Sequence, residues 1–568
     1  MNPRLQRLWA LLPIVMIALT YFWALGVVGK RTLRRHDSDK TIIRIAHWQL
    51  EAGVREGLNE AAAEYQKQHP HVEIRQEAIP ESGYGQWLSI QLLGGTAPDI
   101  VEIGAVPRNL LLMFYQRYLL PITPYVARPN PYNKGTDLEN EPLINTFMDG
   151  LRQSYIPEIQ EYMTIPLSRM SMRLFYNKTL LKKLTGRNEP PSDFREFILM
   201  CEKIASLSDP AGRPYIPISG SGYHLQGWRM SIFSPVTYSA YREVDLNGDG
   251  RVGSDEWAIA YLSGRISLEH PAYKGMFELM EEVTRFFQQG WIGLNRDEAI
   301  FNFAQQRALF ISSGLWEAGG LAQLAEGKFE IGIIDFPLPG PTDPKYGSLI
   351  EGPRYENPEG SVPFAVSKTS LHAETAVDFL LFLASREQNA RFNARLKWLP
   401  LIVGAESLPE LKVFEPTLEG VFPTFYPVLG GESVIRWSQL ESLFLAGQLS
   451  FEELNRQYSE FMRERAGNDI AEYQRNKIRA QARQFSIAGN LRSRALNTPE
   501  PEAAPLWKHY REIALRAIES DVSYFTTLKQ LNDLPDLREK PIYQYSGQAR
   551  ERIQREFAPQ PPAKASTP

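Results

Sequence analysis

The strongest constraint on the fold of this chain is a regular alternation of strand and helix signals that begins at residue 41. Residues 41–47 are predicted to form a short buried strand, and a helix signal with an apolar stripe follows it. A second strand around residues 72–74, a helix over 84–93 and a third strand within 99–104 come next. This βαβαβ pattern predicts a parallel sheet covered by helices, in which ligands bind beyond the carboxyl ends of the strands.

A second series of strand and helix signals starts at residue 162. An extended segment at 162–166 and the run MRLFYNKTLLKK at 172–183 precede a Pro-Pro break and a helix. The apolar stripe of this helix consists of Phe194, Phe197, Ile198, Cys201 and Ile204. We expect Cys201 to be a buried structural thiol rather than a nucleophile, because nothing near it in the sequence would lower its pKa.

The remainder of the chain is mixed in character. Strands are predicted at 329–337 and 362–366, and a strongly apolar helix begins at 376–382. Residues 440–485 are predicted to be helical and amphipathic, whereas the proline-rich residues 558–568 are typical of a frayed tail.

Composition excludes several classes of protein. The 568 residues are 43% hydrophobic and 23% charged, which allows sizeable cores and excludes a disordered or collagen-like chain. A single cysteine rules out an internal disulfide and a multi-cysteine metal site. The net charge of -4 lacks the positive field of a dedicated nucleic-acid binder, so no nucleic-acid partner is expected.

The N-terminal region carries the signal for membrane association. Leu8 to Gly29 are uncharged, and this stretch approaches the roughly 20 residues with which a helix spans a bilayer. It is preceded by Arg4 and Arg7 and exceeds the about 7 to 15 apolar residues of a cleaved signal, which favours an uncleaved anchor. Ala24 and Gly26 would suit signal peptidase, so cleavage stays open. We expect the remainder on the periplasmic or extracellular face, anchored in the cytoplasmic membrane.

One segment predicts a metal site. Residues 245–256, DLNGDGRVGSDE, fit the calcium-loop pattern D-x-[DN]-x-[DN]-G-x5-E at every specified position. Side-chain oxygens and one main-chain carbonyl, that of Arg251, would form the calcium-binding set of Asp245, Asn247, Asp249, Arg251 and Glu256. The alternative is an ordinary acidic turn. Since no second loop pairs with this one, we expect a single structural calcium ion that stabilises a local insertion.

Several segments, taken in order, resemble family 1 extracellular solute-binding proteins, the maltose-binding-protein-like receptors of ATP-driven importers. The resemblance extends over about residues 41–465. The segments that carry it are TIIRIAHWQ at the start, GGTAPDIVEIG at 94–104, LFYNKTLLKKLTG at 174–186, FAQQRALFISSGLW at 303–316, KFEIGIIDFPLPGP at 328–341 and VPFAVSKTSLHAETAVDFLLFLASREQ at 362–388.

The resemblance implies an α/β, two-lobe periplasmic-binding-protein fold (type II-like) with a hinge. The N-lobe would comprise residues 41–163 and 364–415, and the C-lobe residues 164–363 and 416–465, including the calcium loop. Residues 1–40 would be the signal or transmembrane helix, and 466–568 a helical C-terminal extension and tail. A carbohydrate would be captured between the lobes and presented to ABC permease subunits.

Most candidate ligand-binding residues follow predicted strands, where flat aromatic faces and planar polar groups suit sugar rings and hydroxyls. Arg169 lies just before the LFYNK segment, and Trp437 would begin a late helix whose start, as the resemblance implies, lines the cleft. For every aromatic residue among them, core packing is the alternative. Arg169 replaces an acidic residue of the family pattern, which raises the hypothesis of an acidic ligand such as a uronic acid. The full set is Trp48, Glu51, Arg169, Tyr223, Trp228, Trp316 and Trp437.

Two other functions stay open at this point. The chain contains no HExxH, GxGxxG, GxSxG or P-loop lysine motif, and its eight histidines are scattered, so an enzyme is not expected. A carbohydrate-active enzyme would need two facing carboxylates, which a sequence with 66 acidic residues neither supports nor excludes. A membrane-anchored ligand sensor would use the same two lobes to report to a partner.

Overall fold

A computed structural model describes residues 40–518, apart from 51–52, 107, 157–158, 160, 247–251, 353, 357–359, 418–424, 426, 429, 505, 512 and 516–517. The chain divides into two compact units, and both are discontinuous in sequence. The first contains residues up to 50 together with 54–120 and 364–383, and the second contains most of the remainder. The predicted lobe boundaries, which differ from this division, stay predictions.

The first unit is built around parallel strands. Strand β1 (Thr41–His47) pairs with β2 (Val72–Ala78) and with β3 (Ile100–Glu102), and both pairings are parallel. Helices α2 (Val54–Gln68) and α3 (Glu81–Leu93) form the two crossovers between these strands, so the predicted βαβαβ pattern is confirmed. Antiparallel to β3 runs the end of β12 (Gly360–Ser367), which also pairs with β4 (Leu119–Leu120).

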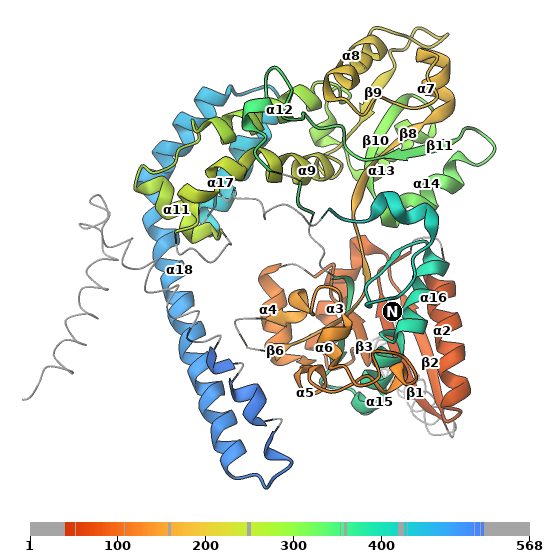
Figure 1. Cartoon of the computed structure of the whole chain (residues 1–568), viewed down its shortest axis with the longest axis vertical. Coiled ribbons are helices and arrows are strands. Elements are labelled where there is room, and N and C mark those ends of the chain that lie inside the picture. Colours follow the sequence, from red (N-terminus) through yellow and green to blue (C-terminus); the bar gives the residue numbers. More distant parts are fainter. Residues whose placement is uncertain are drawn as a thin grey trace, which may run out of the picture. The chain divides into compact units, whose positions relative to one another are not determined.

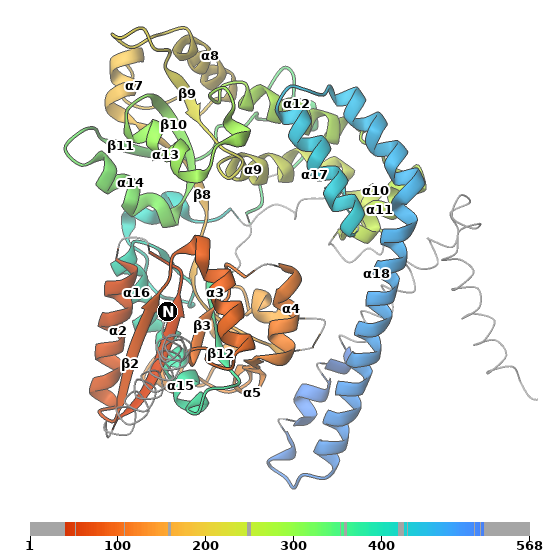
Figure 2. The same cartoon turned by 180° about the vertical axis from the view of Figure 1, so that it is seen from behind.

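A segment from late in the sequence completes this unit. Helix α15 (Ala373–Leu383) brings Phe379 and Phe382 against the ring of Tyr65 on α2, with ring centroids 5.1 and 5.4 Å apart. The Tyr65 hydroxyl donates to the Asp378 carboxylate at 2.7 Å. Helix α4 (Arg108–Arg117) is the remaining helix of the unit among its described residues (Figure 2).

The second unit contains a four-stranded sheet in the order β11-β8-β10-β9. Its strands are β8 (Met172–Asn177), β9 (Ile216–Ser219), β10 (Ala308–Gly314) and β11 (Ile331–Ile334). Among the hydrogen-bonded pairs of this sheet, only β9 and β10 are parallel, so their carboxyl ends lie at the same edge, and β8 runs antiparallel to both of its neighbours. The helices of this part are α7 (Lys178–Thr185), α8 (Phe194–Ala205), α13 (Arg296–Ala304) and α14 (Ala318–Ala325).

Cys201 lies on the buried face of α8, as predicted, and it is fully buried. Burial raises the pKa of its thiol well above the usual value. The smaller elements of the unit are α5 (Thr123–Val126), α6 (Leu143–Thr146), β5 (Tyr155–Ile156), β6 (Glu161–Tyr162), β7 (Ile165–Arg169), α16 (Arg386–Leu396) and β13 (Leu399–Pro400).

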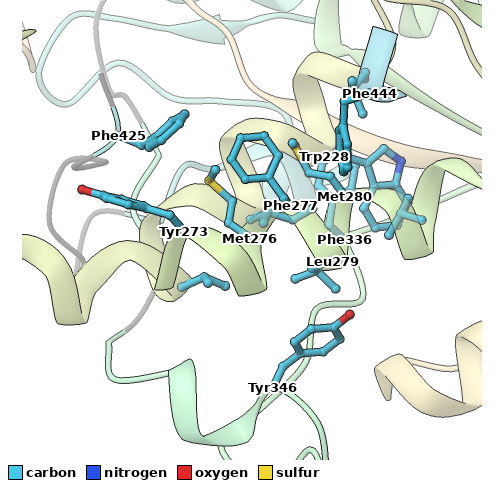
Figure 3. Close-up of a cluster of buried hydrophobic side chains, with 14 of the residues drawn as sticks. Trp228, Tyr273, Met276, Phe277, Leu279, Met280, Phe336, Tyr346, Phe425 and Phe444 are labelled. Carbon is cyan, nitrogen blue, oxygen red and sulfur yellow. The ribbon is translucent and has the colours of Figure 1, made fainter. Parts of the chain in front are cut away.

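Much of the second unit's core lies between helices. Side chains of α12 (Pro271–Thr284), among them Phe277, pack with Trp228 of α9 (Leu225–Thr237) and with Phe444 of α17 (Gly431–Leu445) (Figure 3). Two short helices, α10 (Tyr241–Val244) and α11 (Ser254–Leu262), flank the predicted calcium loop. These apolar contacts stabilise the helical part of the unit because they remove large side chains from water.

The predicted helical character of residues 440–485 is confirmed, but the structure divides this region between two helices. The structure has α17 and then α18 (Phe451–Leu496), separated by residues 446–450. Gly447 adopts a positive φ of 68°, which stops α17, and the Ser450 side chain caps α18 by accepting the amide of Glu453. Asp469 of α18 in turn accepts the amides of Glu432 and Ser433, at the start of α17.

Helix α18 has 46 residues and is largely polar. Within the described part of the chain, no helix combines the length and the apolar character needed to cross a bilayer. The predicted transmembrane or signal segment, residues 8–29, lies outside the described residues.

Candidate functional site

In the first unit, candidate binding residues gather where β1 and β3 end. Trp48 directly follows β1 and is partly exposed, and its indole lies against Gly104, beyond the end of β3. The main-chain N–H of Trp48 donates to Glu102 Oε2 at 3.3 Å, and the Gln49 side-chain amide donates to Glu102 Oε1. A fully buried carboxylate therefore fixes the main chain on which Trp48 is displayed.

Glu102 and Gln49 were not among the predicted site residues. Glu102 is the last residue of β3, so the rule that parallel strands bring their carboxyl ends to one edge could have identified it. The indole Nε1 of Trp48 is buried and has no hydrogen-bond partner among the described residues. Such a donor is uncommon in a folded protein, although the core residue Trp228 has one as well.

In the second unit, the corresponding edge lies beyond β9 and β10. Tyr223 follows β9, and Trp316 follows β10 within the short η5 turn (Leu315–Glu317). Both side chains are partly exposed. The indole of Trp316 lies over Gly314, the last residue of β10, at a place that leaves no room for a side chain. Two aromatic rings are thus presented from one edge of the sheet.

Arg296 and Glu317 form a polar pair beside these aromatic rings. The Arg296 guanidinium lies over the Tyr223 ring, with Cζ 5.2 Å from the centroid, and its Nε donates to the Glu317 carboxylate. The Ser313 hydroxyl donates to the other oxygen of Glu317, which is 5% exposed. The arrangement fixes a planar cation on the Tyr223 ring and pairs it with a carboxylate on the residue that follows Trp316.

Neither Arg296 nor Glu317 was predicted. Glu317 follows Trp316 at the end of a strand, which is a detectable signal. Arg296 is less accessible to sequence reasoning, because it begins α13 after an Asn295–Glu298 capping box, which by itself indicates only a helix start.

The buried ring of His224 packs against the Tyr223 ring. The ring of His224 is fully buried, contacts the Tyr223 ring edge-to-face with centroids 5.3 Å apart, and has Nδ1 2.8 Å from the Ser221 hydroxyl. Burial, aided by the nearby charge of Arg296, lowers the pKa of His224 to about 3. The imidazole is therefore neutral at physiological pH and serves as a rigid support rather than a charge.

Two predicted site residues lie in the core instead. Trp228 is fully buried and packs edge-to-face on Phe336, with centroids 4.8 Å apart (Figure 3). Trp437 lies in the second turn of α17 rather than at its start, and contacts Phe425 and Tyr458. Both tryptophans therefore follow the core-packing alternative. They pack in the same buried cluster as the apolar side chains of α12.

Arg169 is also engaged within the protein. It is 7% exposed on β7, where Nε donates to the Pro400 carbonyl at 2.9 Å and Nη2 to Glu415 Oε2 at 3.0 Å. Its charge is therefore already paired with a carboxylate of this chain. The last predicted residue, Glu51, lies outside the described residues.

The predicted calcium loop is described only at its two ends. Asn247, Asp249 and Arg251 lie outside the described residues. Glu256 is 3% exposed, and its carboxylate accepts the amides of Leu246 and Gly253, each at 2.9 Å. Among the residues that the structure describes, no group of three or more acidic, histidine or cysteine side chains could hold a metal ion.

Two α/β units with candidate residues beyond the carboxyl ends of their strands define the class of two-lobe solute-binding proteins. Residues 51–390 match the family model described as bacterial extracellular solute-binding protein. This match covers more than half of the chain, and the protein belongs to that family.

The chain is also similar to individual proteins. It is 22% identical to the multiple sugar-binding protein of Streptococcus mutans serotype c over 332 residues, which cover 55% of this chain and 68% of that protein. The apo-form of RafE from Streptococcus pneumoniae is 17% identical over 75% of this chain and 98% of RafE, with a TM-score of 0.50. A protein connected with xylan utilization by Caldanaerobius polysaccharolyticus is 18% identical over 74% and 99%, also with a TM-score of 0.50. These two structures show the fold.

Proposed function

We propose that this protein is the substrate-binding component of an ABC-type importer, and that it captures an oligosaccharide between its two lobes and presents it to the permease. The observation that carries this proposal is the set of Tyr223, Arg296, Glu317 and Trp316 beyond β9 and β10. The multiple sugar-binding protein and the xylan-related relative support a carbohydrate as the ligand class.

The chemistry of the set suits a sugar. Aromatic faces such as those of Tyr223 and Trp316 stack on the apolar C–H face of a pyranose ring. A fixed carboxylate accepts, and a fixed guanidinium donates, the hydrogen bonds of hydroxyl groups. Trp48, held by Glu102, would supply a further stacking face from the first unit. A ligand that contacts both lobes only in the closed state favours closure by its difference in affinity for the two states.

A neutral oligosaccharide fits these residues better than an acidic one. Arg169 is paired with Glu415, and Arg296 is paired with Glu317. A uronic acid bound to either arginine would have to displace a carboxylate that is already hydrogen-bonded. The acidic-ligand hypothesis requires tighter binding of an acidic sugar than of a neutral one. The existing carboxylate partners of both arginines argue against such tighter binding.

Location and metal binding belong to the same proposal. Membership of an extracellular solute-binding family implies the extracellular or periplasmic face of the membrane, and residues 8–29 would anchor the chain or serve as its signal peptide. Asp245 and Glu256, with Asn247, Asp249 and the Arg251 carbonyl, would hold one calcium ion. This ion would cross-link the start and end of the loop between α10 and α11.

Isothermal titration calorimetry against a panel of neutral and acidic oligosaccharides tests the function, with product analysis of each mixture. Saturable binding of at least one neutral oligosaccharide without turnover is expected. If no sugar binds while amino acids or peptides do, the ligand class is wrong. If the bound sugar is cleaved, the protein is an enzyme and the receptor proposal fails.

A further inference from the structure

The end of α18 forms, with the segment that follows it, a helical arm within the second unit. We define the arm as the described residues among 471–496 of α18 and 503–518. One face of α18 is covered, because Ala488 and Leu491 pack against Ile513, with Ile487, Leu506 and Tyr510 beside them. Figures 1 and 2 both show the later segment running back along the end of α18. The arm is therefore a folded feature rather than an isolated helix.

A different face of α18 carries exposed apolar side chains. Ile478, Phe485 and Leu496 are 45, 51 and 64% exposed. At about 100° per residue, Phe485 lies about 20° from Ile478 around the helix, and Leu496 returns to the same direction as Ile478. The three residues thus form one stripe along the axis. Leu515 and Ile518 on the second segment of the arm are 58 and 56% exposed.

The charge of the arm contrasts with that of the whole chain. Residues 471–496 contain six basic residues and one acidic residue, Glu472, although the complete protein has a net charge of -4. Arg475, Arg479 and Arg483 are exposed and follow one another at i, i+4 and i+8. They form a row that lies beside the apolar stripe.

We propose that this face of the arm lies on an anionic phospholipid bilayer. A helix that combines an apolar stripe with a flanking row of arginines suits the bilayer interface, because the apolar side chains enter the headgroup boundary while the arginines meet lipid phosphates. A protein partner is less favoured, since the centre of a protein interface is depleted of charge and this face is strongly basic. The proposal is independent of the ligand and does not depend on residues 8–29.

A fluorescent reporter on the arm distinguishes arm docking from simple tethering of the chain. Ser486, next to Phe485, is exposed, and a polarity-sensitive probe can be attached to Ser486→Cys. The native Cys201 is fully buried and its pKa is raised, so it reacts slowly. Ser192→Cys, at an exposed position in the same unit, provides the matched control. The full chain is mixed with vesicles of phosphatidylcholine alone or with phosphatidylglycerol added.

We expect a blue shift of the Ser486→Cys probe with anionic vesicles, a much smaller shift with neutral vesicles, and none for the Ser192→Cys probe. In the Ser486→Cys background, Arg475→Gln with Arg479→Gln should weaken the response to anionic lipid by about tenfold to thirtyfold. Arg187→Gln with Arg391→Gln, which removes two exposed arginines elsewhere, should leave it unchanged. Ile478→Ser with Phe485→Ser, which removes two side chains of the apolar stripe, should abolish the shift.

Three results would overturn the proposal. An unchanged Ser486→Cys probe with anionic vesicles would mean that the arm does not meet the bilayer. Equal shifts of both probes, or equal shifts with both lipids, would indicate non-specific attachment. A probe that is already blue-shifted without vesicles would mean that protein, either this chain or a second copy, covers the stripe.

Discussion

The six-membered ring of Trp316 lies over Gly314, so that a methyl group added at Gly314 would be 2.2 Å from the ring. Real side-chain carbons do not approach an aromatic ring so closely. Because Gly314 pairs with Met172 of β8, the strand can move little to relieve the contact. The position of one candidate stacking surface therefore depends on the absence of a side chain two residues before it.

Gly314→Ala should weaken oligosaccharide binding by about tenfold, because the added methyl group displaces the indole of Trp316. Calorimetric titration with the sugar that the wild type binds measures this effect, and circular dichroism checks the fold. Gly320→Ala is the matched control, since a side chain there meets open space. Unchanged affinity in Gly314→Ala would remove Trp316 from the proposed site.

Trp48→Ala should lower the affinity for the same sugar by up to about tenfold through loss of a stacking face. The control is Trp87→Ala, which removes another partly buried tryptophan of the same unit, on α3. If both variants lose affinity equally, the effect reflects the stability of the first unit and not contact with ligand.

Acidification should destabilise the protein through His224. Because burial lowers the pKa of His224 to about 3, the folded state keeps this imidazole neutral while the unfolded state protonates near pH 6.5. The contribution is complete above pH 6.5 and is lost as the pH falls toward the folded-state pKa. Between pH 7 and pH 5, this amounts to about 2 kcal/mol of unfolding free energy.

Urea denaturation at pH 7 and pH 5 checks this prediction. His224→Gln, whose side chain does not titrate, should lose about 2 kcal/mol less than the wild type over that interval. An identical loss in both proteins would show that other groups cause the acid sensitivity.

Asp469→Ala should destabilise the packing of α18 on α17. The Asp469 carboxylate is 2% exposed and accepts the amides of Ser433 at 2.8 Å and Glu432 at 3.1 Å. Removal of a helix cap costs about 1 to 2 kcal/mol of unfolding free energy, which chemical denaturation would detect. Glu464→Ala, at an exposed position of the same helix, should have little effect. Equal losses in the two variants would contradict a capping role.

Calcium should raise the melting temperature, and a chelator should reverse the gain. A ligand that binds only the folded state stabilises it by RT ln(1 + [L]/Kd), so the gain increases with the calcium concentration. Asp249→Asn should reduce the rise in melting temperature, because it replaces one carboxylate ligand of the predicted set with a neutral amide oxygen. Magnesium at equal concentration is the control. A melting temperature that is insensitive to calcium would favour the acidic-turn alternative.

Local patterns were sufficient to predict most elements but not the roles of all side chains. The strand at 41–47 and the stripe around Cys201 were predicted correctly, because periodicity reports burial directly. Trp228 and Trp316 both follow strand signals, yet one enters the core and the other remains partly exposed. The difference depends on α12, which is far away in sequence and supplies the apolar surface for Trp228.

Charge pairing was equally inaccessible to sequence reasoning. Arg169 and Arg296 pair with Glu415 and Glu317, which are 246 and 21 positions away in the sequence. No local spacing rule connects such partners, whereas strand ends could have identified Glu102 and Glu317. The amphipathic pattern over residues 440–485 predicted helical structure but did not locate the break between α17 and α18, where Gly447 has a positive φ.

Tyr65 and Asp378, which bond within the first unit, are 313 positions apart. The ribosome must therefore synthesise residues 121–363, which belong to the second unit, before all parts of the first unit's core exist. Such distant pairing slows folding. The first unit would therefore stay incompletely folded until residue 378 has been made, and a protein-conducting channel transports unfolded rather than folded chain.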